Sequence, residues 1–335
     1  MQRYHRALIG EIEMSDEWGS LDAVFIGGGT PSRIQPELIG SVLDALASKF
    51  GLASDVEISM EANPEDISAT SSPGFLKAGV NRLSLGVQSF DDVVLRELGR
   101  QHTSDEAQTA VAAARAAFPR VSIDLIYGHP VETDLSWERT LDITVALGID
   151  HVSAYSLTVE LGTALSRAVA KGYPAPDDDI LADRWERAAE RLGEQFIRYE
   201  VSNYAAEEPC RYNLATWAQG EYKAFGLGAH GHRGGVRTRN LRRIDRYMEA
   251  VESGRRPLAG ETAVSGWDRE QERLMLGLRR AAGVLTGPAG RRVLDLHPEF
   301  VKAGIVKEEA GRIVVARPLL TDTVIREVLA MPPPE

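Results

Sequence analysis

Short β-branched runs alternate with longer helical patterns over the first half of the chain. The predicted strands are residues 22–26, 56–61, 82–88, 121–127 and 151–157. Between them, residues 36–50 and 104–118 carry apolar side chains at helical spacing, and Pro36 suits a first helical turn. This alternation is typical of βα units around a parallel sheet. It fits both an open, doubly wound sheet and a (β/α) barrel.

The pattern changes after Pro174. An acidic stretch leads into a predicted helix at 181–192, and residues 196–205 suggest one more strand and a loop. From about Gly254 the chain becomes charged and helical, with a strand-like run at 311–316 and a last helix near 321–330. We therefore predict an α/β fold with a large domain over residues 1–250. A small helical domain with a hairpin or wing is predicted over residues 251–335.

Composition places the chain among globular proteins. With 335 residues, 43% of them hydrophobic, it can bury a large core. No apolar run reaches the roughly 18 residues of a membrane span, and carboxylates occupy the start where a signal peptide would be apolar. We therefore expect no transmembrane segment and a cytoplasmic location. A net charge of −11 argues against nucleic acid as the main partner.

Cysteine content limits the metal chemistry of this chain. Cys210 is the single cysteine, which excludes an internal disulfide and any multi-cysteine zinc or iron–sulfur site built from this chain alone. We interpret Cys210 as an ordinary residue rather than a ligand. Isolated histidines receive no metal role, namely His5, His102, His129, His151 and His297.

Polar residues gather where the predicted strands end. The GGGTP segment at 27–31 follows an apolar strand, and its glycines allow a ligand close to the backbone, although a tight turn without a ligand explains it equally well. Glu61, Gln88 and Asp124 fall at or near the C-terminal ends of three successive strands. In a (β/α) barrel such ends converge on one cavity, whereas each residue alone could be a cap.

Several segments, in this order, resemble the family of HemW heme chaperones and oxygen-independent coproporphyrinogen III oxidases within the radical SAM superfamily. They are GGGTP, EANPED, AGVNRLSLGVQSF, LGRQH, IDLIYGHP, YSLTVELGT, YEVSNYA and GLGAHGH. The resemblance covers nearly the whole chain. It implies a partial (β/α) barrel of radical SAM type with its first strand missing, followed by a small, winged-helix-like C-terminal domain.

The resemblance also implies a site for S-adenosylmethionine (SAM). Gly28, Gly29 and Thr30 would meet the amino-acid end of SAM. The SAM pockets would be lined by Glu61, Gln88, Arg100 and Asp124. The chemical types agree, because carboxylates accept hydrogen bonds from an ammonium or from ribose hydroxyls, and an arginine pairs with a carboxylate.

One departure from the family concerns its iron–sulfur cluster. Family members bind a 4Fe–4S cluster through three cysteines in a C-x3-C-x2-C loop, and SAM chelates the fourth iron. The ligands of that cluster are absent from this chain, so we do not expect radical chemistry. We expect the chain to be truncated, because the apolar run at 23–26 predicts a strand buried on both faces, which needs neighbours.

Two further departures lie in short motifs. Where relatives read GLPGQT, this chain has GHPVET at 128–133. Where they read CRHN, it has CRYN, with Tyr212 in place of a histidine. The second change argues against a heme-ligand role at this position.

Histidines followed by arginines form a candidate heme site. His230 and His232 lie in the glycine-rich GLGAHGH segment, and heme iron takes imidazole ligands. The strongest basic run of the chain follows, and Arg237 and its neighbours could pair with propionates. Its members are Arg233, Arg237, Arg239, Arg242, Arg243 and Arg246. The alternative interpretation is a solvated helix face beside a structural loop.

The resemblance favours a heme chaperone that binds heme and transfers it to heme-accepting proteins. One alternative is an enzyme of the oxygen-independent coproporphyrinogen III oxidase type, against which the missing cysteines stand. Another is a cluster-free barrel that binds a nucleoside-like ligand or acts as a scaffold. Heme binding distinguishes the chaperone from this last alternative.

Overall fold

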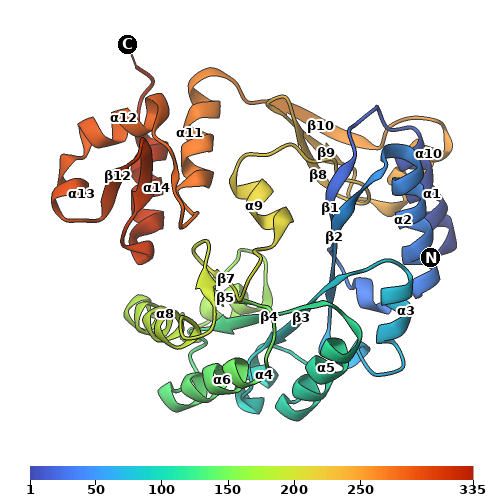
Figure 1. Cartoon of the computed structure of the whole chain (residues 1–335), viewed down its shortest axis with the longest axis horizontal. Helices are drawn as coiled ribbons and strands as arrows, with labels where there is room; N and C mark the ends of the chain where they lie inside the picture. The colour runs from blue at the N-terminus through green and yellow to red at the C-terminus, as the bar shows by residue number, and fades with distance from the viewer. Residues whose placement is uncertain (335) are drawn as a thin grey trace. The chain divides into compact units, whose positions relative to one another are not determined.

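The structure is a computed structural model that describes residues 1–334 (Figure 1). Its contacts divide the chain into two compact units. The first contains residues 1–24, residues 37–56 and the chain from residue 210 onwards, and the second contains residues 25–36 and 57–209. The predicted domain boundary between residues 250 and 251 stays a prediction.

A seven-stranded sheet forms the centre of the α/β architecture. Its strand order is β1-β2-β3-β4-β5-β7-β6. Strands β2 to β5 pair in parallel, as the βα alternation predicts, and β7, in the segment predicted to hold one more strand, pairs antiparallel to β5. The strands are β1 (Leu21–Ile26), β2 (Leu52–Ala62), β3 (Arg82–Gln88), β4 (Arg120–Tyr127), β5 (His151–Ser156), β6 (Ile197–Arg198) and β7 (Asn203–Ala205).

Strand β1 corrects one detail of the sequence interpretation. Its apolar run predicted burial on both faces, but five of its six residues are only half-buried and Asp22 is exposed. The reason is its position, because β1 is an edge strand with β2 on one side only.

The helices of the second unit follow the predicted crossovers. In Figure 1, α5, α6 and α8 accompany strands β3 to β5. Helix α8 begins three residues before the predicted start, because Asp177 caps it by accepting hydrogen bonds from the backbone N–H groups of Asp179 and Ile180. The helices are α3 (Ser72–Lys77), α4 (Asp92–Glu97), α5 (Ser104–Ala117), α6 (Asp134–Ala146), α7 (Ala164–Val169) and α8 (Asp178–Leu192).

A three-stranded antiparallel sheet in the first unit corrects a second interpretation. One of the two interpretations of the histidine and arginine segment, a solvated helix face beside a structural loop, is wrong for residues 230–240. These residues form a hairpin of β8 (His230–Arg233) and β9 (Val236–Asn240), joined by β10 (Leu258–Ala263). Gly234 and Gly235 both have positive φ and form its two-residue turn. Such a Gly-Gly turn matches the twist of a hairpin, and this signal outweighs the helical composition of the arginine run.

The C-terminal part of the first unit has its own apolar core. Leu274, Val293, Ile313, Val324 and Val328 are buried there. Helices pack around a small sheet of order β11-β13-β12, so the predicted helices and hairpin are confirmed. The elements are α11 (Gly266–Gly277), β11 (Val284–Leu285), α12 (Gly287–Leu296), α13 (Pro298–Lys302), β12 (Val306–Glu309), β13 (Arg312–Val315) and α14 (Thr321–Ala330).

The remaining helices of the first unit are α1 (Gln2–Glu13), α2 (Pro36–Phe50), α9 (Arg211–Trp217) and α10 (Ile244–Glu252). Short 3-10 helices occupy Pro31–Arg33, Pro64–Asp66 and Pro318–Leu320. Within residues 1–334, no helix is both long enough and apolar enough to cross a membrane.

Candidate functional site

The second unit brings together the residues that follow its strand ends. Gly28, after β1, donates its backbone N–H to Oε2 of Glu61 at the end of β2, over 3.1 Å. Gly28 and Gly29 have φ values of 80° and 66°, and a Cβ at either position would meet no atom within 4 Å. The glycines therefore supply a left-handed turn whose backbone is open on its outer side. Thr30 completes this turn and precedes the first 3-10 helix.

Arg100 lies beside the next two strand ends. Its Nη2 donates to Oδ1 of Asn63, over 2.8 Å, and to the carbonyl of Gly86, over 3.0 Å. Its Nε is buried and has no hydrogen-bond partner in the described structure. Gln88, at the end of β3, has a φ of 68°, a conformation that non-glycine residues rarely adopt. A strained residue beside an unsatisfied donor is typical of a ligand site.

Asp124 lies on β4 and is largely removed from water. The Ser84 hydroxyl on β3 donates to its carboxylate over 3.2 Å. Burial raises the pKa of Asp124, while a hydrogen bond with Ser153 and the charge of Arg82 lower it. The Asp124 carboxyl is therefore an acceptor whose charge is costly unless a donor reaches it.

Sequence reasoning missed the polar partners of this set, namely Asn63, Ser84 and Ser153. The register pairs Asp124 with Ser153 on β5. The available signal was the occurrence of serines in otherwise apolar parallel strands, where a buried hydroxyl needs a partner.

The residues at and near the strand ends match the polar groups of SAM, whereas the residues of this chain do not match a 4Fe–4S cluster. We call the first group the strand-end set: Gly28, Gly29, Thr30, Glu61, Gln88, Arg100 and Asp124. An open glycine turn, a buried guanidinium with a free N–H and two carboxylates match the carboxylate, ammonium and hydroxyl groups of SAM. By contrast, residues 1–334 contain no group of three His, Cys, Asp or Glu side chains placed to hold a metal ion. Cys210 is buried at the N-terminus of α9.

The β8–β9 hairpin places the candidate heme residues on one face. His230 pairs with Arg239 and His232 with Arg237. Directly opposite residues of an antiparallel pair share a face, as do residues two apart on a strand. The hairpin register therefore brings both histidines to the same face as two arginines, which a helix would not have done.

His232 is buried at this face, and only one of its two ring nitrogens has a hydrogen-bond partner in the described structure. Its Nδ1 lies 2.9 Å from the carbonyl oxygen of Gly220, and its Nε2 is buried without a partner in the described structure. A carbonyl only accepts, so Nδ1 carries the proton and Nε2 presents a lone pair. By contrast, His102 and His151 engage both ring nitrogens with protein groups.

The arginines after the hairpin turn differ in their availability. Arg237 pairs with Glu272, with Nη2 and Oε1 2.6 Å apart. Arg243 and Arg246 pair with acidic residues of their own helix, α10. Arg239 and Arg242 are exposed and have no ion pair within residues 1–334, so they are the guanidinium groups most available to an acidic ligand.

A buried ion pair lies in the loop after β4, where sequence reasoning assigned no role. Oε2 of Glu132 accepts hydrogen bonds from the backbone N–H of Gly128, over 2.8 Å, and from Nε of Arg184, over 3.2 Å. The side chains of Glu132 and Arg184 are 2% and 3% exposed. Burial raises the pKa of Glu132 from 4.5 to about 7, against these hydrogen bonds and the charge of Arg184, which lower it.

Glu132 makes stability depend on pH in a defined direction. Between pH 4.5 and 7 the Glu132 carboxyl is protonated to a greater extent in the folded chain than in the unfolded chain. Its contribution to the free energy of unfolding therefore falls as pH rises from 4.5 to 7. Replacing Glu132 with glutamine removes the titration. We expect the stability of E132Q relative to the wild type to rise by about 3 kcal/mol between pH 4.5 and pH 8, measured by urea unfolding. A difference that is constant across this range would contradict the assignment.

Comparisons with known proteins agree with this architecture. The sequence model of the Radical SAM superfamily matches residues 4–143. Heme chaperone HemW of Mycobacterium tuberculosis is 37% identical over 98% of this chain and 86% of that protein. Heme chaperone HemW of Bacillus subtilis is 34% identical over 84% of this chain and 77% of that protein.

One solved structure resembles the chain over nearly its whole length. It is the coproporphyrinogen III oxidase HemN from Escherichia coli, described as a radical SAM enzyme, with a TM-score of 0.82 and 21% sequence identity. The match covers 98% of this chain and 82% of that one. The predicted α/β fold, a partial barrel of radical SAM type, is therefore confirmed.

Proposed function

Because this chain belongs to the HemW family of heme chaperones, we propose that it binds heme and passes it to heme-accepting proteins. The family is of radical SAM lineage. The proposal includes the cytoplasmic location that the sequence predicts. It does not name the proteins that accept heme.

The observation that carries the proposal is the ring of His232. Its protonated Nδ1 is held by the Gly220 carbonyl, and its unpartnered Nε2 has the lone pair that iron requires. Metal-bound histidines commonly have this arrangement, with the second nitrogen fixed by a carbonyl. His230 lies two residues away on the same face and is exposed. We assign the iron of heme to one of these two histidines: His230 is exposed, whereas Nε2 of His232 is buried and reaches iron only when this face opens.

The propionates of heme are assigned to the arginines of the same hairpin face and the segment that follows it. Arg239 lies opposite His230, and Arg242 is exposed just beyond β9. Arg237 lies opposite His232, but its guanidinium already pairs with Glu272. Arg239 and Arg242 therefore supply the first propionate contacts, and Arg237 joins them when it leaves Glu272.

We assign SAM to the strand-end set of the second unit. The backbone of Gly28, Gly29 and Thr30 would receive its amino-acid end. Its remaining polar groups would be met by Glu61, Gln88, Arg100 and Asp124. Bound SAM supplies a cationic sulfonium, and the residues of this chain bind and orient it. They do not fit the cluster that would deliver an electron, so radical chemistry is not part of the proposed function.

Removing the arginines tests the propionate assignment. We expect the triple variant Arg237→Ala, Arg239→Ala, Arg242→Ala to bind heme at least tenfold more weakly, measured by titration of the Soret band. Each lost charge-assisted pair costs about 1.5–3 kcal/mol, whereas exposed charges change stability by less than roughly 0.5 kcal/mol. A matched control removes three exposed arginines elsewhere: Arg115→Ala, Arg167→Ala, Arg326→Ala. Equal affinity in the two triple variants would remove the hairpin arginines from the site.

Replacing Glu272 tests the same assignment through an expected gain in heme affinity. The E272Q variant frees the guanidinium of Arg237, so its heme affinity should rise above that of the wild type. A fall in affinity would show that the Arg237–Glu272 pair supports the site as a unit.

A further inference from the structure

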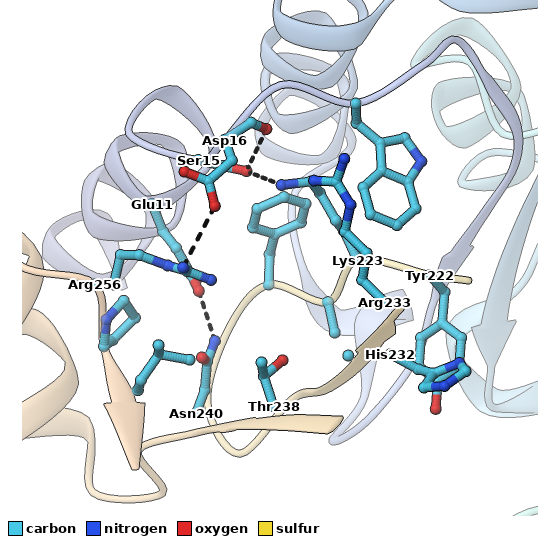
Figure 2. Close-up of a pocket in the computed structure, with 16 residues that line it drawn as sticks. Glu11, Ser15, Asp16, Tyr222, Lys223, His232, Arg233, Thr238, Asn240 and Arg256 are labelled. Carbon is cyan, nitrogen blue, oxygen red and sulfur yellow. Dashed lines mark hydrogen bonds and ion pairs between the residues drawn. The ribbon is translucent and has the colours of Figure 1, made fainter. Parts of the chain in front are cut away.

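The first unit contains a cavity lined in part by the β8–β9 hairpin, with His232, Arg233 and Thr238 among the lining residues (Figure 2). Arg233 and Thr238 alternate along the strands with the histidines and arginines of the proposed heme face, so their side chains point to the other side. The cavity volume is about 90 Å³. One water needs roughly 10–15 Å³ on this measure, so the space holds a compact ion and is too small for a nucleotide.

Three cations line this cavity, and two of them have no acidic partner. The Lys223 ammonium donates to the Ser15 hydroxyl over 2.7 Å, and Arg233 donates to the backbone carbonyl of Glu17 over 3.1 Å. No carboxylate within residues 1–334 forms an ion pair with either. Arg256, the third cation, lies 3.4 Å from Asp16. Lys223 and Arg233 therefore place positive charge at the cavity without a carboxylate in ion-pair contact.

The indole ring of Trp18 holds two of these cations close to each other. Lys223 and Arg233 both lie over the indole ring of Trp18, at 5.4 Å and 4.7 Å from its centroid. Cation–π contacts stabilise each cation but leave its charge in place. Burial lowers the pKa of Lys223, Asp16 opposes this effect, and Arg233 and Arg256 add to it. An anion in the cavity would relieve this mutual repulsion.

The two carboxylates at the cavity form no ion pair with Lys223 or Arg233. Glu11 accepts from the Tyr247 hydroxyl over 2.5 Å, from the side-chain amide of Asn240 over 2.6 Å and from the backbone N–H of Gly226 over 2.8 Å. Burial raises the pKa of Glu11, which favours its neutral form. Asp16 is engaged by Arg256. Figure 2 shows Glu11 directed toward Asn240 and the acidic chain of Asp16 toward Arg256.

We propose that this cavity binds a compact oxyanion, a phosphate or a carboxylate group, through Lys223, Arg233 and Arg256. The two unpaired cations supply charge-assisted hydrogen bonds to the anion, and Arg256 contributes from the pair with Asp16. The site does not depend on the proposed heme function. Its ligand is a free oxyanion or a carboxylate carried by a larger molecule.

The test is isothermal titration calorimetry of the full chain with inorganic phosphate in a chloride buffer. We expect saturable binding of one phosphate per chain, with the affinity lowered at least tenfold in K223Q and in R233Q. A tenfold loss is about 1.4 kcal/mol, which is expected when one charge-assisted hydrogen bond is removed. The matched control is K302Q, which removes an exposed lysine of α13 and should bind phosphate as the wild type does. Unfolding transitions without phosphate establish that each variant is folded, and two single variants keep the test valid if one fails to fold.

One further titration identifies the source of the anion. If sodium propionate competes with phosphate, the cavity accepts a carboxylate of a larger molecule. If propionate does not compete, the cavity serves a free oxyanion such as phosphate. Absence of phosphate and propionate binding to the wild type would overturn the proposal, as would equal phosphate affinity in K223Q, R233Q and K302Q. Failure of heme to bind would affect only the proposed function, since the phosphate titration is independent of it.

Discussion

Replacing Arg184 with alanine is expected to lower the free energy of unfolding by about 3–5 kcal/mol at pH 8, because it leaves a buried carboxylate without its partner. Arg184 and Glu132 are almost fully buried, and Arg184 Nη2 also donates to Asp134 over 2.7 Å. The loss is measured by chemical denaturation.

Arg187 provides the matched control on the same helix. It also pairs with carboxylates, including Asp134 and Asp183, but its side chain is 33% exposed. Surface pairs of this kind contribute about 0–1 kcal/mol, so Arg187→Ala should cost far less than Arg184→Ala. Adding E132Q to Arg184→Ala should restore part of the stability, because the unpaired charge is removed. Equal losses for the two arginines would show that burial of the pair is not what stabilises it.

Anaerobic reconstitution with iron and sulfide should leave this chain without iron–sulfur absorption. One cysteine cannot replace three thiolates, and residues 1–334 hold no alternative cluster of ligands. With dithionite added, we expect no cleavage of SAM. About four irons per chain together with release of 5′-deoxyadenosine would contradict this prediction. The control is the same chain without added iron, which should be spectroscopically identical.

Many helices and strands of the chain could be predicted from sequence because these elements are specified locally. Residues 36–50 form α2 as expected, and β3 has the predicted bounds. Helix α5 ends one residue before the predicted end, and its start carries a capping box formed by Thr103 and Glu106. Periodicity and caps are short-range signals, so one sequence is sufficient to find them.

The parts that could not be predicted depend on residues far apart in the chain. Glu132 and Arg184 are brought together by the packing of α6 and α8, which no local pattern encodes. The pair between Arg237 and Glu272 likewise limits a candidate ligand residue that appeared available in the sequence. The hairpin was missed for a different reason. Its Gly-Gly turn is visible in the sequence, but the charged run after it left a solvated helix face open as one of two interpretations.

The residues at the strand ends show which part of the candidate SAM site could be predicted from sequence. Glu61, Gln88 and Asp124 were placed at or near strand ends from sequence. Glu61 and Gln88 do lie at the ends of β2 and β3, whereas Asp124 lies within β4, three residues before its end. Their supporting hydrogen bonds were not predictable, because Asn63 and Ser84 become partners only in the folded sheet. Their role toward SAM stays a proposal.

The central claim is that this chain binds heme as its cargo, and one titration tests it most directly. Hemin is added to the purified full chain, the mixture is passed through a desalting column, and bound heme is counted as its pyridine complex alongside the Soret band. We predict a saturable, shifted Soret band with one heme per chain, weakened in the triple variant of Arg237, Arg239 and Arg242. The contradicting result is an unshifted band with no retained heme, in a sample that still binds S-adenosylmethionine. That outcome would leave a cluster-free barrel that binds a nucleoside-like ligand.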